Sequence, residues 1–176
     1  SLLAKEGEKI ETKVYTMDDL KIIEDESPVA KKTYGNTMGT LFKKAVALKL
    51  DTVDLNTIKA YSTSKDASLL ASLVIKKNNA KMMTEELLRV QTPRSAAPYH
   101  LLIINKLSEY TTVLDNITKA EVDPMRATLA FNDYLPSIKS LFTSLTFLQE
   151  YFTLQEITFS KNEPGYVLTV GYTTQQ

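Results

Sequence analysis

Apolar residues between positions 123 and 154 recur at steps of three or four, which is the period of one helix face. The apolar stripe is broad, which is typical of a core helix packed against several neighbours rather than of a coiled-coil strand. Asp123 can cap the first turn, and Pro124 follows where a missing N–H costs nothing. The stripe consists of Phe131, Leu135, Ile138, Phe142, Leu145, Leu148 and Phe152, widened by Tyr134, Leu141 and Tyr151. We therefore expect this helix to provide most of the shared interior.

Pro136 lies deep inside this helical pattern. A proline at such a position removes one backbone hydrogen bond and clashes with the carbonyl four residues earlier, at a cost of about 3 kcal/mol. The apolar period continues on both sides, which favours a kink between Asn132 and Pro136. The alternative is a full break, with Pro136 starting a second helix.

Earlier segments show the same helical period, with Ser27-Pro28 and Asp66 as capped starts and Pro98 as a third start. Short connectors make sequential helices antiparallel neighbours. The predicted fold is therefore all-α: an up-and-down bundle of about four main helices plus a short helix. The expected segments are residues 28–50, 67–90, 98–120 and 123–154, with a short helix of two to three turns at 55–61.

Two glycines interrupt the apolar face of the first predicted helix. Gly35 and Gly39 lie four residues apart, which indicates close approach by another backbone. We interpret the spacing as packing rather than as a membrane dimer motif. It is not a phosphate-binding loop, because the Lys-Ser or Lys-Thr ending is missing and no strand precedes it.

The helical period is absent at both ends of the chain. Residues 1–27 hold four lysines against eight acidic residues without a sustained apolar face, so they are predicted to be a linker or arm. Leu20, Ile22 and Ile23 are expected to pin this arm onto the bundle domain, residues 28–176.

Beyond Leu154, residues 157–160 alternate, 162–165 have turn composition, and 166–172 are rich in strand formers. This pattern predicts a small C-terminal β-hairpin that docks on the bundle or pairs with residues 14–16, because an isolated hairpin is marginal in water. An extended tail is the alternative.

Composition narrows the possible functions. The chain has no cysteine, which excludes disulfides, thiolate metal sites and cysteine nucleophiles. Its formal net charge is zero, and its 176 residues include only three arginines, so no basic patch indicates nucleic-acid binding. No apolar run approaches the roughly 18 residues that cross a bilayer.

His100 is the only histidine, in the first turn of the helix that follows Pro98. A general base or metal ligand there would need partners, for which Asp123 and Asp133 are the only candidates. The simpler interpretation is a hydrogen-bonded histidine at the bundle end. No zinc-protease, di-metal, hydrolase or calcium-loop pattern occurs. We therefore predict no catalytic residue, no metal and no cofactor, and favour a binding or structural module over an enzyme.

A set of short motifs, weak singly and suggestive in their order, spans nearly all of the chain after the lead-in. They are Tyr15-Thr16, Asp19-Leu20, Tyr34-Gly35-Asn36, Pro98-Tyr99-His100-Leu101, Asn105, Asp123-Pro124, Tyr134, Tyr151-Phe152 and Ile157-Thr158-Phe159. In these the chain resembles a group of uncharacterised helical proteins from bacteria with small genomes. The resemblance implies a membrane anchor preceding Ser1 and a domain outside the cytoplasmic membrane. It brings no activity, ligand or catalytic residue.

Two functional hypotheses follow. The first is an extracytoplasmic, membrane-tethered helical interaction domain that binds a protein or cell-envelope partner. The second is a small-molecule sensor or binding bundle, with a pocket near the Pro136 kink lined by Tyr110, Phe131 and Tyr134, and with His100 as a further candidate ligand-binding residue. A hydrolase using His100 ranks third. The oligomeric state is left open.

Overall fold

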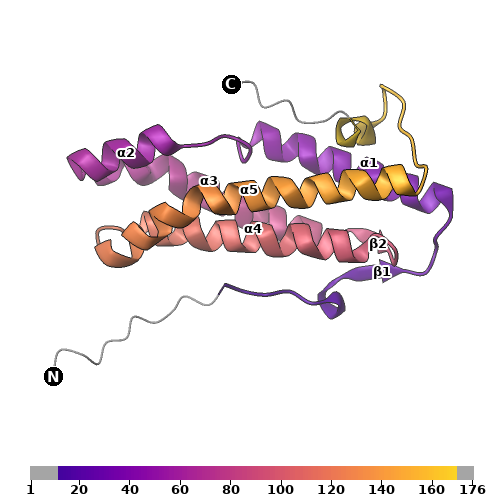
Figure 1. Cartoon of the computed structure of the whole chain (residues 1–176), viewed down its shortest axis with the longest axis horizontal. Helices are drawn as coiled ribbons and strands as arrows, with labels where there is room; N and C mark the ends of the chain where they lie inside the picture. Colours follow the sequence, from indigo (N-terminus) through magenta and orange to yellow (C-terminus); the bar gives the residue numbers. More distant parts are fainter. Residues whose placement is uncertain (1–11, 170–176) are drawn as a thin grey trace.

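Helices make up most of the computed structural model, which describes residues 12–169. Four long helices lie side by side, and the short α2 lies at one end (Figure 1). The predicted all-α bundle of four main helices and one short helix is confirmed. Within the described residues, the α-helices are α1 (Pro28–Ala47), α2 (Leu55–Ser64), α3 (Ala71–Leu87), α4 (Ala97–Thr118) and α5 (Pro124–Leu154). The described residues also form three short 3-10 helices: η1 (Met17–Asp19) before α1, η2 (Ala67–Leu70) between α2 and α3, and η3 (Pro164–Leu168) after α5.

Helix α5 is continuous from Pro124 to Leu154, with Pro136 inside it, so the alternative of a full break is wrong. The Asp123 side chain caps its start by accepting a hydrogen bond from the Arg126 N–H at 3.0 Å. Figure 1 shows the first part of α5 at an angle to the rest, as expected for a proline kink. Pro136 itself is exposed, and the buried residues on either side of it hold both parts of the helix against the core.

Helix α3 ends at Leu87 rather than at the predicted Val90, and a turn at residues 88–90 leads to the strand that pairs with the arm. Strand β1 (Lys21–Ile23) runs parallel to β2 (Gln91–Pro93), with Ile22 opposite Thr92. The Arg94 N–H then donates to the carbonyl of Ile23 at 3.2 Å. The arm is therefore pinned to the bundle through its apolar residues, as predicted.

Further along the arm, α4 supplies the hydrogen-bond partners. The Tyr15 N–H donates to the side-chain oxygen of Asn105 at 2.8 Å, and the Asn105 amide donates to the Tyr15 carbonyl at 3.0 Å. The Ser108 hydroxyl donates to the Lys13 carbonyl at 2.7 Å. Residues 14–16 thus bind a helix surface rather than a C-terminal hairpin. The first part of the predicted linker, residues 1–11, lies outside the described residues.

The predicted C-terminal hairpin is wrong within the described residues, because Pro164–Leu168 forms the helix η3. Pro164 starts this helix, and its turns close through Tyr166 N–H to Glu163 and Thr169 N–H to Tyr166. Residues 157–160 lie outside any helix or strand, so only this part of the described tail is compatible with the alternative of an extended tail, and η3 departs from it. The remaining predicted strand residues, 170–172, lie outside the described part of the chain.

The close approach of another backbone predicted at the two glycines of α1 is confirmed at Gly39, whereas at Gly35 the close neighbour is a side chain. A Cβ atom at Gly39 would lie 2.1 Å from the carbonyl oxygen of Pro164, so only glycine lets the η3 backbone reach this point. A Cβ atom at Gly35 would lie 2.2 Å from the ring of Phe159. Between them, the Asn36 side chain accepts a hydrogen bond from Gly165 N–H at 2.9 Å. This part of α1 is closed against its neighbours.

Candidate binding cleft

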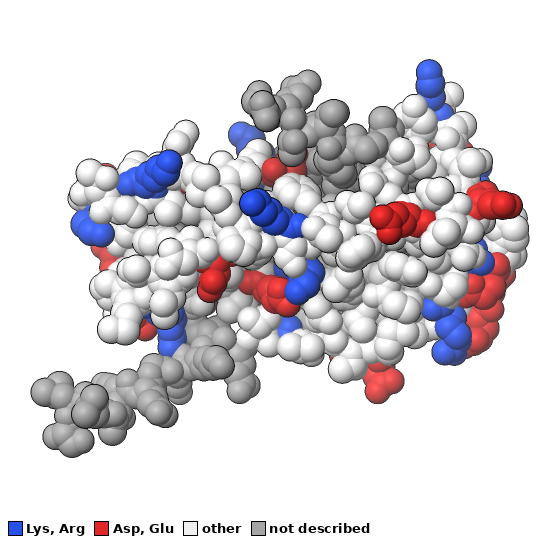
Figure 2. Space-filling view, in the orientation of Figure 1, with Lys and Arg blue, Asp and Glu red and all other residues white. Residues whose placement is uncertain are grey.

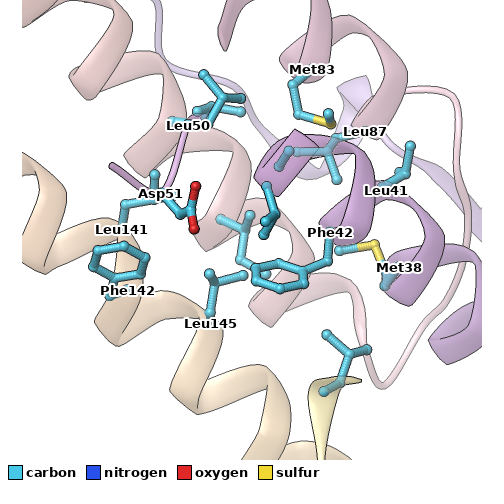
Figure 3. Close-up of a pocket in the computed structure, with 15 residues that line it drawn as sticks. Met38, Leu41, Phe42, Leu50, Asp51, Met83, Leu87, Leu141, Phe142 and Leu145 are labelled. Carbon is cyan, nitrogen blue, oxygen red and sulfur yellow. The ribbon is translucent and has the colours of Figure 1, made fainter. Parts of the chain in front are cut away.

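An apolar cleft opens between α1 and α5, with α3, α4 and η3 forming its other walls (Figure 3). It holds about 70 Å³. Helix α1 contributes Met38, Leu41, Phe42, Ala45 and Val46, and α5 contributes Leu141, Phe142 and Leu145. Leu50 follows α1, Met83 and Leu87 come from α3, Ile103 and Leu107 from α4, and Leu168 from η3. Every side chain in this set is apolar.

Among the lining residues that the structure describes, Asp51 is the one polar residue, and the end of α1 places it there. Lys49 adopts a left-handed conformation with φ of 57°, and its N–H bonds to the Val46 carbonyl at 2.9 Å. The Leu50 N–H bonds back to the Ala45 carbonyl at 3.0 Å. This is a Schellman ending, which turns the chain sharply and buries the following apolar residue. Leu50 is accordingly buried, and Asp51 comes next at the cleft.

The Asp51 carboxylate is half-buried and points into the space between α1 and α5 (Figure 3). Within residues 12–169, no hydrogen bond or ion pair to it is found. Lys44, in the last turn of α1, pairs with Glu86, and Lys76 of α3 pairs with Asp54. A carboxylate at the edge of an apolar cleft favours a ligand that carries a cation or a hydrogen-bond donor.

A larger groove of about 520 Å³ lies between α3 and α4, but it is a weaker candidate. Most of its lining residues carry polar or charged groups, and they include the ion pair between Lys77 and Asp115 at 3.2 Å. On the face shown in Figure 2, lysines and arginines are likewise dispersed among acidic residues. Charged groups that already satisfy one another offer less to a ligand than a desolvated apolar surface does.

Two of the predicted ligand-binding residues, Tyr110 and Tyr134, do lie together. Their rings are 6.1 Å apart between centroids, and both side chains are completely buried. The Tyr134 hydroxyl donates to the Asp54 carboxylate at 3.1 Å and accepts from the Asp54 N–H at 3.0 Å. Burial raises the pKa of Tyr134 to about 12 and raises that of Tyr110 as well.

The same cluster extends to α3 through Lys76, whose side chain is only 6% exposed. Its ammonium group pairs with Asp54 and donates to the carbonyl and hydroxyl oxygens of Thr52, both at 2.8 Å. Because three acceptors surround it, the buried ammonium group of Lys76 needs no further hydrogen-bond partner. The cluster therefore ties the start of α2 to α3 and α5, and none of its residues lines the apolar cleft.

His100 and Phe131 lie elsewhere. Phe131 is half-buried in an edge contact with Tyr61 of α2, at 6.4 Å between ring centroids. His100 is fully buried, and it lies ten residues before Tyr110 on α4, or about 15 Å at roughly 1.5 Å per residue. The structure thus brings together only two of the four predicted ligand-binding residues. Whether they bind a ligand stays a prediction.

The hydrogen bonds of His100 define its protonation. Its Nε2 lies 2.9 Å from the Leu87 carbonyl, which can only accept, so Nε2 carries the hydrogen. Its Nδ1, 3.0 Å from the Tyr34 hydroxyl, therefore accepts. Burial lowers the pKa of His100 to about 4, so the ring is neutral. The simpler interpretation of a hydrogen-bonded histidine is confirmed, and neither candidate partner, Asp123 or Asp133, bonds to it.

The cleft residues were recognised in the sequence only as packing positions. Met38, Leu41 and Phe42 belong to the predicted buried face of α1, and Leu141 and Leu145 to that of α5. The hydrophobic period identifies the inward face but not how closely the next helix approaches. The one residue in the sequence that could have indicated the cleft is Asp51, an acidic residue directly after Leu50, which is buried.

Neither metal nor membrane features emerge from the described part of the chain. Residues 12–169 contain no group of three His, Asp or Glu side chains placed to hold a metal ion. None of the described helices is both long and apolar enough to cross a bilayer. No protein-family model, curated protein or solved structure matches the chain. The resemblance to membrane-anchored bacterial proteins therefore stays a prediction.

Proposed function

We propose that this chain is an interaction domain that binds a protein or cell-envelope partner through the apolar cleft between α1 and α5. The observation that supports the proposal is the cleft itself, which four long helices, α1, α3, α4 and α5, and the short η3 line with apolar side chains. Open concave apolar surface of this kind is typical of binding sites. In this proposal the domain is tethered outside the cytoplasmic membrane by a segment preceding Ser1, as the resemblance implies.

Site-specific photocrosslinking in intact cells tests this function. A benzoylphenylalanine at Val46, which lines the cleft and is 40% exposed, should capture a defined partner. The same group at Val122, which is 88% exposed at the far end of α4, is the matched control and should not. Protease added outside spheroplasts should degrade the domain. Capture of cytosolic proteins alone, or equal capture from both positions, would contradict the proposal.

A small apolar molecule is the second candidate, because the first cleft residue on α5 is Leu141, five residues beyond Pro136. This places a pocket near the predicted kink, although with a different lining from the predicted one. Native mass spectrometry of the protein purified from its own cells should then show a bound species. The cleft-filling variant Ala45→Leu should lose that species, and Ala60→Leu, at an exposed position of α2, should keep it.

A further inference from the structure

We infer that the cleft is a socket for one aliphatic side chain of a partner polypeptide, with a neighbouring lysine or arginine of that partner paired to Asp51. This inference rests on the proposed function and names the chemistry of the partner. It follows from three observations: the size of the cleft, the character of its walls, and the single charge at its edge.

Size decides how much of a ligand can enter. An apolar cavity of about 150 Å³ takes a benzene ring, whereas this cleft offers about 70 Å³. A branched side chain such as that of leucine fits such a space, but a lipid chain or a cofactor ring does not. The rest of any ligand must therefore stay at the surface, which favours an anchor residue of a larger partner over a complete small molecule.

The walls suit an aliphatic group. Met38 and Met83 bring flexible thioethers that adapt to the shape of a guest, and Leu141 and Leu145 project from the opposite side (Figure 3). Interfaces commonly gain much of their affinity from a few side chains that are buried in well-packed pockets. The affinity of this contact thus comes from apolar burial, and its selectivity must come from a polar group.

Asp51 supplies that polar group. Its carboxylate faces the cleft without a described partner, and the backbone turn at Lys49 and Leu50 holds it there. A cation on the partner, one residue from the anchor, would complete an ion pair at the rim while the anchor fills the socket. An acidic group at the same place would be repelled. The preferred motif is therefore an aliphatic residue next to Lys or Arg.

Three capped hexapeptides test this motif: one with a central Leu-Lys, one with Leu-Gln and one with Ser-Lys. Methionine methyl groups labelled with ¹³C report binding by NMR, because Met38 and Met83 line the cleft whereas Met17 and Met125 are exposed elsewhere. The Leu-Lys peptide should shift the Met38 and Met83 signals saturably and bind about fivefold more tightly than Leu-Gln. The Ser-Lys peptide should leave them unchanged.

Variants separate the two parts of the site. Asp51→Asn should remove the preference for Leu-Lys over Leu-Gln, whereas Asp133→Asn, at an exposed position of α5, should keep it. Ala45→Leu should abolish the Met38 shift, and Ala60→Leu should not. Equal binding of Leu-Lys and Leu-Gln to the wild type would overturn the inference, and so would a preference that survives in Asp51→Asn.

One further arm uses 3-methylbutan-1-amine, which carries the same aliphatic group and cation in a small molecule. Saturable shifts from this amine, with none from any peptide, would overturn the inference in favour of a small-molecule ligand. Failure of every probe to shift Met38 would overturn it outright. The proposed function is judged separately, by crosslinking at Val46, so the two can fail independently.

Discussion

Two halves of one helix face behave differently in this molecule. On α1, Gly35, Gly39, Phe42 and Val46 follow each other at steps of four, three and four, so they form one stripe. At the two glycines, Phe159 and the η3 backbone close against the helix. At Phe42 and Val46 the stripe borders the apolar cleft. Residue size along the stripe, rather than its hydrophobic period, therefore decides where the bundle closes and where it stays accessible.

The closed half is also held by polar contacts. Glu163, just before η3, accepts from the Ser160 N–H at 2.7 Å and pairs with Lys32 at 3.0 Å, and these contacts lower the pKa of Glu163 to about 2. The Asn36 amide reaches the same carboxylate at 3.3 Å. At the open half, Asp51 has no such partner within residues 12–169. The described polar contacts thus gather in one half, and the proposed binding cleft lies in the other.

The strongest test of this contrast is Phe152→Ala. Phe152 is 1% exposed in the closed half and contacts the rings of Tyr34 and Phe159, so its truncation should cost about 3–5 kcal/mol in urea unfolding. Phe142→Ala at the half-buried cleft is the matched variant and should cost clearly less. Equal losses for the two variants would mean that the halves are packed alike.

Acid should loosen the closed half through His100. The unfolded histidine has a pKa near 6.5 and the folded one about 4, so the unfolded state binds more protons between these values. The stabilisation is complete above pH 6.5 and falls by about 3 kcal/mol as the pH drops to 4. Urea unfolding across this range measures the loss. The His100→Gln variant should show a much flatter dependence, and a profile unchanged from the wild type would contradict this.

Gly39→Ala tests the backbone approach itself. The new methyl group would meet the carbonyl oxygen of Pro164, which belongs to the backbone and cannot rotate away. Overpacking costs about 1–3 kcal/mol, which exceeds the roughly 1 kcal/mol that alanine contributes to helix formation. Thr40→Ala, next to it and exposed, should stay within about 0.5 kcal/mol. Wild-type stability in Gly39→Ala would show that η3 does not lie so close.

The smallest effect is expected for Ala45→Leu at the open half. Extra methyl groups there enter space that is already available, so stability should rise by up to about 1 kcal/mol in the same urea assay. The exposed counterpart Ala60→Leu should change little. A loss comparable to that of Gly39→Ala would indicate that the cleft is already filled.

The helices were predictable because their signals are local. Ser27 and Asp123 cap their helices as expected, and the apolar period defined each inward face. The pairing of β1 with β2 was not predictable in the same way, because its partners lie 70 residues apart, as Lys21 and Gln91 do. The prediction of a C-terminal hairpin was wrong although the residues there are strand formers. Pro164 starts a 3-10 helix instead, and Gly39 leaves room for this helix to pack on α1.

For the candidate site, too, local patterns were predictable and the distances between helices were not. The contact of Tyr110 with Tyr134 matches the expectation that they lie together near the kink, because both residues lie on inward faces of neighbouring helices. The cleft was not predicted, since it depends on how far α1 stands from α5 beyond Gly39. That distance results from the shapes of many side chains and from the position of η3, so no single sequence motif predicts it.

The attachment of the arm has a mechanical consequence. The arm runs antiparallel to α4, with Lys13 bonded to Ser108 and Tyr15 to Asn105, before β1 joins β2. Tension applied from the residue 12 side would load these links one after another, as in opening a zipper, rather than all at once. In a domain pulled from its N-terminal end, the arm would therefore detach from α4 first, while the four long helices stayed folded.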